Sequence, residues 1–287
     1  MKRLVLLGLL LAAPALAHDG HDHEIGWTLG PLVTVPLGLT LLLHAIGMAR
    51  LWQRSDRGRT ALRRDALLFA AGWLSLAGAL VSPLHEAGER SFALHMIEHE
   101  IIMLVSALLL VAARPGAAFL WAFPSSIRQA LGGAGRWPLW RLFADPFVAT
   151  ALQAVVIVVW HVPWLFDLTL RSDGWHIAQH LSFVGSALLF WWAMLYGRAG
   201  PFVAAACLFV TSMIGGGLGA LMALSNSPWY PSYVALGLTP AGLTPEQDQQ
   251  LAGLIMWVPG GAWHLAAALW FLARGLRRME TRHALRP

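Results

Sequence analysis

The stretch LHMIEHEIIMLVSALLLVAA, residues 94–113, joins a polar first turn to a long apolar run. Its two histidines stand four residues apart, with one glutamate between them and another directly after the second. About 20 mostly apolar residues are enough to cross a membrane as a helix. Ionisable side chains inside such a helix are costly and usually functional. The stretch therefore predicts a transmembrane helix that carries a polar site near one end.

The composition extends this prediction to the whole chain of 287 residues. Hydrophobic residues make up 57% and charged residues 12%, whereas about 25% of a typical soluble domain is charged. This balance is typical of a membrane protein. We expect an all-α polytopic membrane helix bundle with about seven transmembrane helices, at residues 27–50, 66–82, 92–113, 146–169, 175–197, 201–224 and 250–273.

The N-terminus predicts a cleaved signal peptide at residues 1–17, MKRLVLLGLLLAAPALA. It has a basic start, a short apolar segment and the small residues of a cleavage site. An uncleaved anchor helix is the alternative, but the apolar segment is too short to span well. Residues 18–26 then form a His-rich tail outside the cytoplasm, residues 27–273 the membrane domain, and residues 274–287 a basic cytoplasmic tail.

Arginine placement predicts the topology of the seven helices. Arginines are frequent in segments 50–65 and 114–145 and after residue 274, whereas the alternating inter-span segments hold only Arg90 and Arg171. Basic residues are enriched in cytoplasmic loops. The membrane domain therefore begins outside the cytoplasm, and the C-terminus is cytoplasmic.

Two histidine pairs, His95 with His99 and His176 with His180, lie near the outer ends of the third and fifth expected spans. Residues four apart lie on one face of a helix. Both spans begin at the outer side, so the two pairs enter the membrane at the same depth. His161, on the fourth span, reaches a similar depth from the opposite direction. We expect these five imidazoles to converge in the interior of the bundle.

Soft and acidic side chains accompany the histidines. Met103 lies one turn beyond His99, Glu98 shares the histidine face, and Met256 lies near the outer end of the seventh span. Imidazole and thioether ligands together favour copper, especially Cu(I). The predicted metal site comprises His95, His99, His161, His176, His180, Met103, Glu98 and Met256.

Packing is the alternative interpretation of a histidine inside a membrane helix, because imidazoles often hydrogen-bond between helices. It is favoured for His44 and His264, which stand alone in their spans. For two pairs at matched depth, packing would require four separate polar partners in a costly environment. A functional site is favoured there.

The segment HDGHDHE, residues 18–24, predicts peripheral metal capture by His18, His21 and His23, with a solvated tail as the alternative. Short His-rich tracts bind metals with little selectivity. His85, in the next outer loop, is expected to add to this surface site.

Several function classes find no support in the sequence. A single cysteine, Cys207, excludes a disulfide framework and a CxxC metal site. There is no phosphate-binding loop, no dinucleotide fingerprint and no indication of nucleic-acid binding. HMIEH, residues 95–99, resembles the zinc-protease motif HExxH only loosely, because its glutamate precedes the second histidine. We expect no enzymatic activity.

Three segments in order, residues 82–115, 160–192 and 248–261, resemble the CtaG-type family of cytochrome c oxidase assembly factors. They include the runs SPLHEAGER, WHVPWLFDLTL and DQQLAGLIMWVPGG. The name also covers an unrelated copper chaperone with a CxC motif, which a chain with one cysteine cannot be.

The resemblance implies a protein of about seven helices in the bacterial plasma (inner) membrane that delivers copper to the Cu_B centre of a haem–copper oxidase. The implied partners are the oxidase catalytic subunit, a periplasmic copper donor and membrane lipid. The role is carried onto His95, Met96, His99, His161, His176 and His180, with Met256 and Asp248 matched less closely. Glu98 departs from the pattern, in which a neutral amide is expected more often.

Three other functions stay open at this point. Histidines on facing helices can ligate haem, so a membrane cytochrome is one alternative. A copper transporter or resistance protein is another, although the inner half of the spans offers few ligands. A scaffold for oxidase subunits without a metal site is the third.

Overall fold

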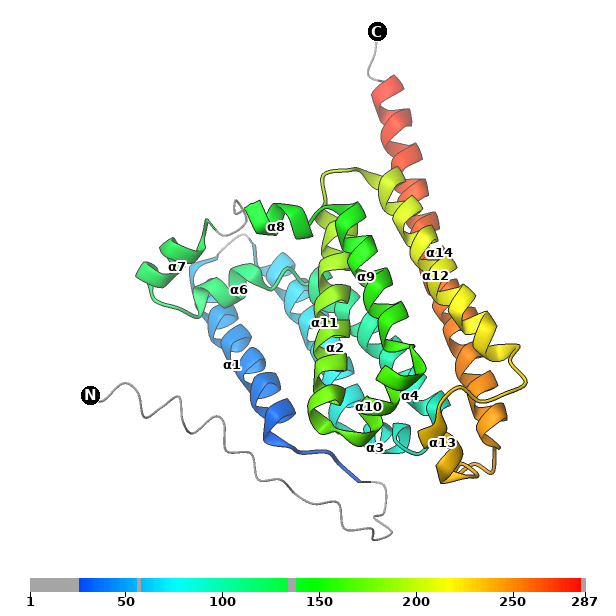
Figure 1. Ribbon diagram of the computed structural model, residues 1–287. Coiled ribbons are helices and arrows are strands. Elements are labelled where there is room, and N and C mark those ends of the chain that lie inside the picture. Colours follow the sequence, from blue (N-terminus) through cyan, green and yellow to red (C-terminus); the bar gives the residue numbers. More distant parts are fainter. Residues whose placement is uncertain (1–25, 56–57, 134–137, 285–287) are drawn as a thin grey trace.

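Long helices run side by side in the computed structural model, which describes residues 26–55, 58–133 and 138–284 (Figure 1). The described residues form an all-helical fold, as predicted. The expected signal peptide and the tail histidines His18, His21 and His23 lie outside the described residues.

The helices of the first half are α1 (Pro31–Arg54), α2 (Arg59–Val81), α3 (Pro83–Gly88), α4 (Phe92–Glu100), η2 (Ile101–Ser106), α5 (Ala107–Ala112), α6 (Gly116–Trp121), α7 (Ser125–Leu131) and α8 (Pro138–Phe143). Those of the second half are α9 (Pro146–Trp160), α10 (Pro163–Arg171), α11 (Asp173–Tyr196), α12 (Pro201–Ala223), α13 (Pro231–Leu236) and α14 (Pro245–Ala284). Among the described residues, six helices are long and apolar enough to cross a membrane, or seven if the bent pair α9–α10 counts as one span. The predicted multi-pass membrane fold is confirmed.

The helices that carry the predicted site form the centre of the bundle. In the most apolar 18-residue stretch of Phe92–Ala112, 56% of the residues are buried. The corresponding share is 50% in α11 and 11% in α1. Apolar side chains of α1 such as Leu32, Val35 and Leu39 are exposed instead, as expected for a helix that faces lipid. The histidines of α4 and α11 therefore lie between other helices and not at the lipid surface.

The third span is continuous but changes its helical pitch directly after Glu100. Residues Ile101–Ser106 form the π-helix η2 between α4 and α5. Such wide turns occur often at functional sites. Because a π turn contains more residues than an α turn, η2 rotates the residues that follow it, and the ladder expected from His99 to Met103 does not continue in α-helical register.

The fourth span is broken, whereas the sequence predicted one helix over 146–169. Asp145 caps the start of α9 by accepting hydrogen bonds from two backbone amides. The helix ends at Trp160, and α10 begins at Pro163 with its axis turned by 74°. Proline lacks an amide hydrogen and restricts the residue before it, so Pro163 favours a kink or an interruption of the helix here. The break lies directly after His161.

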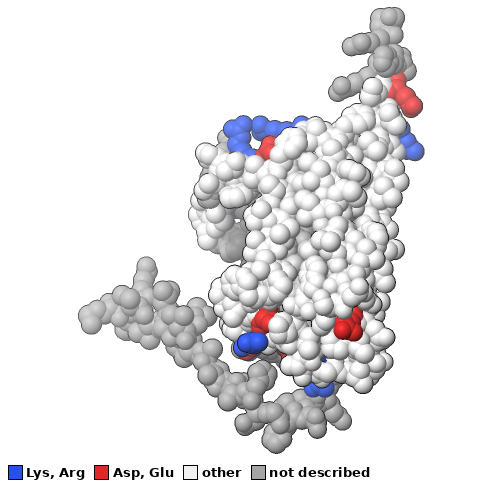
Figure 2. Space-filling model, turned by 45° about the vertical axis from the view of Figure 1, so that its right-hand side comes forward, with Lys and Arg blue, Asp and Glu red and all other residues white. Residues whose placement is uncertain are grey.

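The two ends of the bundle differ in charge. The short helices α3, α10 and α13 lie at one end and α6, α7 and α8 at the other (Figure 1). On the face shown in Figure 2, basic side chains gather near the end with the C-terminus, and acidic side chains with a few basic ones lie near the opposite end. A wide uncharged band separates them among the described residues of this face, as expected for a surface in contact with hydrocarbon.

Helices α12 and α14 pack closely along each other at a pair of glycines. A Cβ atom added to Gly219 would lie 2.7 Å from the carbonyl oxygen of Gly253. Small residues of this kind allow close helix packing in membranes. Helix α14 has 40 residues and extends beyond the expected span 250–273 at both ends. It is continuous through Pro259. Its C-terminal part extends beyond the other helices (Figure 1).

Candidate metal centre

A buried aspartate fixes the start of the helix that carries His95 and His99. Asp248 of α14 accepts hydrogen bonds from the Ser91 hydroxyl at 2.8 Å and from the backbone amides of Phe92 at 2.5 Å and Ala93 at 3.3 Å. These amides have no partner within the helix, and a negative charge there also interacts favourably with the helix dipole. Asp248 therefore holds α4 in place from 155 residues away in sequence.

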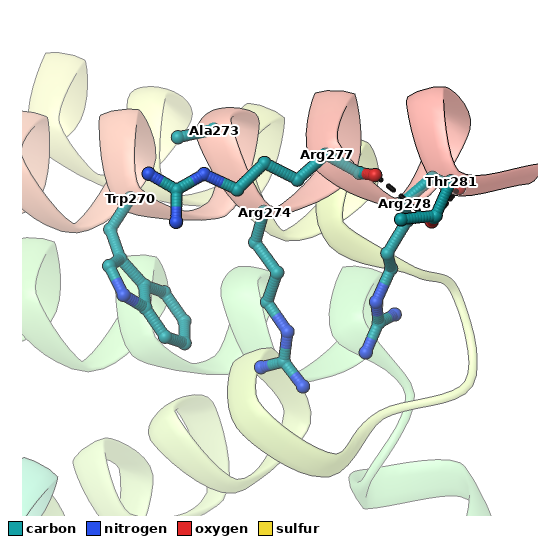
Figure 3. A pocket seen from close by; sticks show the side chains of 6 residues that line it. All are labelled: Trp270, Ala273, Arg274, Arg277, Arg278 and Thr281. Atoms are coloured by element: carbon teal, nitrogen blue, oxygen red, sulfur yellow. Dashed lines mark hydrogen bonds between the residues drawn. The ribbon is translucent and has the colours of Figure 1, made fainter. Parts of the chain in front are cut away.

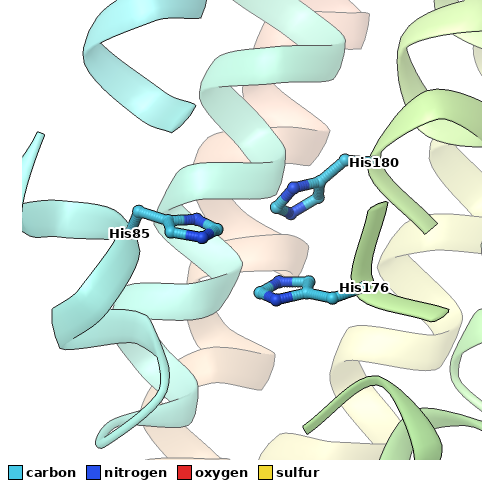
Figure 4. Close-up of side chains that lie close together, drawn as sticks. All are labelled: His85, His176 and His180. Atoms are coloured by element: carbon cyan, nitrogen blue, oxygen red, sulfur yellow. The ribbon is translucent and has the colours of Figure 1, made fainter. Parts of the chain in front are cut away.

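Three histidines from two distant segments meet at the end of the bundle where α4 begins. His85 lies in α3, and His176 and His180 lie one turn apart in α11. One ligand atom from each lies within 4.8 Å of the other two. Figure 4 shows the three rings directed toward one another across the gap between α3 and α11. We call His85, His176 and His180 the histidine triad.

Glu98 connects this triad to α4. Its Oε1 lies 2.8 Å from His85 Nδ1 and 3.6 Å from His180 Nε2, and its side chain is fully buried. Burial of the His85 ring favours the neutral form, but the hydrogen bond to Glu98 and the charges of Glu98, Glu89 and Glu86 outweigh this effect and raise the pKa of His85. A carboxylate in this position orients imidazoles around a metal and supplies negative charge to it.

His95 and His99 extend the cluster from α4. The His95 ring stacks on His176 with a centroid distance of 5.6 Å, and the His99 ring lies 5.3 Å from that of His180. His95 and His99 themselves are 4.3 Å apart. The two predicted pairs therefore meet, as their matched depth indicated. We call these five histidines the histidine cluster: His85, His95, His99, His176 and His180.

His161 approaches the cluster from the break between α9 and α10. Its Nδ1 lies 2.7 Å from the carbonyl oxygen of Ile157. A carbonyl can only accept, so Nδ1 carries the hydrogen and Nε2 keeps its lone pair. Tyr230 donates a hydrogen bond to the His161 carbonyl, which the helix break leaves free. His161 lies near His95 and His99, but no ring contact joins it to the triad among the described residues.

The donor atoms of this region fit a metal ion. Both ring nitrogens of His95 and His99 are buried and have no hydrogen-bond partner among the described residues, and the same holds for Nε2 of His161 and His176 and for Glu98 Oε2. A buried polar group without a partner costs about 1–3 kcal/mol. These atoms lie around the triad, whose imidazoles are within ligand reach of one another, and a cation bound there would stabilise such donors.

The structure separates two of the predicted ligands from this centre. Met103 and Met256 line a cavity together with Glu100 and His264, and none of the triad histidines is part of that lining. Of the two histidines interpreted as packing residues, His44 stacks on Phe69 at 3.5 Å. His264 lies in the lining of that second cavity.

Two residues of the site, His85 and Gln179, have a larger role in the structure than their sequence context indicated. His85 was expected at the surface, but the bend of the chain through α3 brings it into the triad. Gln179, which lies between His176 and His180 in sequence, was not predicted as a site residue. Its side chain is fully buried, and neither of its polar atoms has a hydrogen-bond partner among the described residues. Its place one residue before His180, inside an apolar span, was the available signal.

A groove near the C-terminal end of α14 is lined by arginines, so its positive charge makes it unsuitable for binding a cation. It is lined by Trp270, Ala273, Arg274, Arg277, Arg278 and Thr281. Figure 3 shows the Arg277 side chain running along the helix and the side chains of Arg274 and Arg278 extending away from it. Clustered arginines at the end of a membrane helix are typical of the lipid headgroup region.

Comparison with protein-family models matches residues 42–278 to the model described as cytochrome c oxidase caa3 assembly factor (Caa3_CtaG). The matched range contains the whole histidine cluster, His161 and Asp248. Comparisons with curated proteins and with solved structures gave no match.

Proposed function

Because the chain belongs to the family of cytochrome c oxidase caa3 assembly factors, we propose that it binds copper at the histidine triad and transfers it to the catalytic subunit of a haem–copper oxidase. Family membership implies association with cytochrome c oxidase and a role in assembly in place of catalysis. The copper itself is the cargo of this proposal, and the Cu_B centre is its destination.

The observation that carries the proposal is the histidine triad. Three imidazoles from α3 and α11 lie within mutual ligand reach, in a region where unpartnered nitrogens also come from α4. Imidazole donors suit copper, zinc, iron and nickel, so the triad alone does not select the metal. The choice of copper is supported by the family's association with an oxidase that holds copper.

The arrangement suits transfer better than storage. His85 belongs to the short helix α3, whereas His176 and His180 belong to the long helix α11. Movement of α3 alone would remove one ligand and leave two, and additional imidazoles of His95 and His99 lie beside them. A metal can then exchange its ligands one at a time, without passing uncoordinated through hydrocarbon.

The proposed orientation places the histidine triad outside the cytoplasm. Arginines concentrate at the opposite end of the sequence-derived topology, in agreement with the positive-inside rule. A periplasmic copper donor would deliver the ion there, and His18, His21 and His23 would capture it before it reaches His85. The membrane in question is the bacterial plasma membrane.

The ring packing favours a single ion over haem. His176 has another imidazole on each side, His85 at 5.0 Å and His95 at 5.6 Å, and both are stacked nearly parallel to it. A haem ligand would instead need a porphyrin plane against its coordinating nitrogen. Absence of a Soret band from the purified protein is the expected result, and a Soret band would support the cytochrome alternative.

Metal analysis of the detergent-purified full chain under reducing conditions tests the proposal. The double variant His176→Ala/His180→Ala is expected to lose about one copper ion per chain relative to the wild type, because two of the three triad ligands are removed. Oxidase activity in cells that carry this variant should fall, as Cu_B is not filled.

The matched control is His44→Phe, which replaces a buried histidine that stacks on Phe69 away from the triad. It should retain copper and support oxidase assembly. Equal copper content in the wild type and in the double variant would refute the proposal, and so would normal oxidase activity in cells with the double variant.

A further inference from the structure

A second polar cavity lies one helical turn deeper than the histidine cluster, between α4–η2, α9, α12 and α14. Its lining includes Glu100, Met103, Gln153, Met256, Gly260 and His264. Its volume is about 20 Å³, enough for one water-sized occupant. Ile157 also lines it, and the carbonyl of Ile157 is the partner of His161. The cavity therefore adjoins the histidines through two helices, by way of Glu100, which follows His99, and Ile157, which contacts His161.

The cavity is rich in acceptors that have no donor. Oε2 of Glu100 and Oε1 of Gln153 are buried and unpartnered among the described residues. The Gln153 amide nitrogen is already used, because it donates to Met103 Sδ at 3.4 Å. A carboxylate in a membrane interior is costly unless a cation compensates its charge. Two buried acceptors without a donor require either a cation in the cavity or a proton on Glu100.

The fold makes room for the Glu100 carboxylate specifically. A Cβ atom at Gly260 would lie 2.8 Å from Glu100 Oε2, so any residue other than glycine there would displace the carboxylate. The carbonyl of the same Gly260 lies 2.9 Å from Nδ1 of His264. Since the carbonyl must accept, Nδ1 carries the hydrogen and Nε2 of His264 keeps a lone pair. A single residue of α14 thus positions two potential ligands.

We propose that this cavity is a second metal site, which binds one Cu(I) ion through the thioethers of Met103 and Met256 and the imidazole of His264. Two thioether sulfurs and one imidazole are soft donors that select Cu(I) over zinc and over hard cations. Glu100 supplies the compensating negative charge. One carboxylate neutralises one monovalent ion, whereas a divalent ion would leave a net charge in hydrocarbon.

The π-helix η2 explains why this site is separate from the first. It begins directly after Glu100 and contains Met103, so it rotates the thioether away from His95 and His99 toward Gln153 and α14. Without this wide turn, Met103 would follow His99 on the same face. Met103 lies about one turn, or ~5.4 Å of axial rise, beyond His99 of the histidine cluster.

The experiment uses the detergent-purified full chain with His176→Ala/His180→Ala as background, so that the histidine triad does not contribute. Anaerobic titration with Cu(I), in competition with a chromophoric Cu(I) chelator, measures stoichiometry and affinity. The background protein is expected to retain about one Cu(I) per chain, with sulfur ligands in its X-ray absorption spectrum. Addition of Met103→Leu and Met256→Leu should remove this ion, and Glu100→Gln should weaken its binding about 10–100-fold.

Met194→Leu is the matched control, because Met194 is as buried as Met103 and Met256, at 4% against 5% exposure, and does not line the cavity. Replacement of methionine by leucine nearly conserves volume and costs less than about 1.5 kcal/mol in a core. Unchanged gel-filtration profiles and thermal midpoints show that the variants are folded.

If the His176→Ala/His180→Ala protein binds no Cu(I), the second site is refuted. It is also refuted if Cu(I) binding persists after Met103→Leu and Met256→Leu are added. A water molecule as sole occupant predicts the first result. Failure here is distinct from failure of the proposed function, which is judged by the copper that wild-type protein loses on mutation of His176 and His180.

Discussion

Replacement of Asp248 by alanine should destabilise the protein and weaken its metal centre, although Asp248 is not expected to touch the metal. Asp248 is 2% exposed, and its carboxylate joins α14 to the first turn of α4. The truncation leaves the backbone amides of Phe92 and Ala93 and the hydroxyl of Ser91 without their acceptor. The start of the helix that carries His95 and His99 then loses its anchor.

The magnitude follows from the three lost interactions. Removal of a helix cap costs about 0.5–2 kcal/mol, and a hydrogen bond to a charged group contributes about 1.5–3 kcal/mol. Ser91 can still cap the helix, since its hydroxyl accepts from the amide of Leu94. We therefore expect the free energy of unfolding to fall by about 2–4 kcal/mol, which is less than the sum of the cap and hydrogen-bond contributions. For a chain of this size this is a fall in the thermal midpoint of about 4–16 °C.

The assay is thermal unfolding of the detergent-purified full chain, followed by intrinsic tryptophan fluorescence, together with copper affinity. Asp248→Asn keeps one carbonyl acceptor and should fall between the wild type and Asp248→Ala. Glu246→Ala is the control, because Glu246 is an exposed acidic residue in the same first turn of α14. Equal midpoints for Asp248→Ala and Glu246→Ala would refute the capping argument.

Two further predictions concern pH and helix packing. Copper affinity should fall as the pH drops through the raised pKa of His85, because the metal requires the neutral ring. In the metal-free protein the charged His85–Glu98 pair stabilises the fold at low pH, and this contribution is lost as the pH rises through the same pKa. In the variant Glu98→Gln, the pH at which copper affinity is half lost should move to a lower value. An unchanged pH midpoint would contradict this prediction. Gly219→Ala should destabilise the protein by about 1–3 kcal/mol, since the added Cβ would press on the Gly253 carbonyl. The control Gly217→Ala, whose Cβ meets nothing within 4 Å, should be neutral or stabilising by up to about 1 kcal/mol. Equal midpoints of the two variants in thermal unfolding would count against the close contact of α12 and α14.

The membrane fold could be predicted because hydrocarbon imposes a simple rule on the chain. Backbone groups in lipid must be satisfied within the segment, so a sufficiently long apolar run becomes a helix. The runs near 31–54, 92–112 and 201–223 meet this rule without reference to their neighbours. Pro163 makes a bend in the fourth span expected, but it is compatible with either a kinked or an interrupted helix, and only packing decides between them.

The candidate site was predictable to the extent that it depends on position along a helix. His95 and His99 lie one turn apart near one end of their span, as do His176 and His180, and the two pairs do meet. The partner of Glu98 was not predictable, since His85 reaches it from a short helix outside the spans. Loop geometry at a bundle end depends on contacts between distant segments, which periodicity does not report.

Apolar length and residue spacing act locally, so they were enough to predict a helical membrane bundle with two histidine pairs near one end of its spans. Which donors share a site was decided by the tertiary structure. It brought His85 to His176 and His180, and through the π turn at Ile101–Ser106 it placed Met103 beside Met256 and His264. The physical reason is that ligand sets are distances between helices, and these are set by helix packing and by local changes of helical pitch that the sequence pattern does not record.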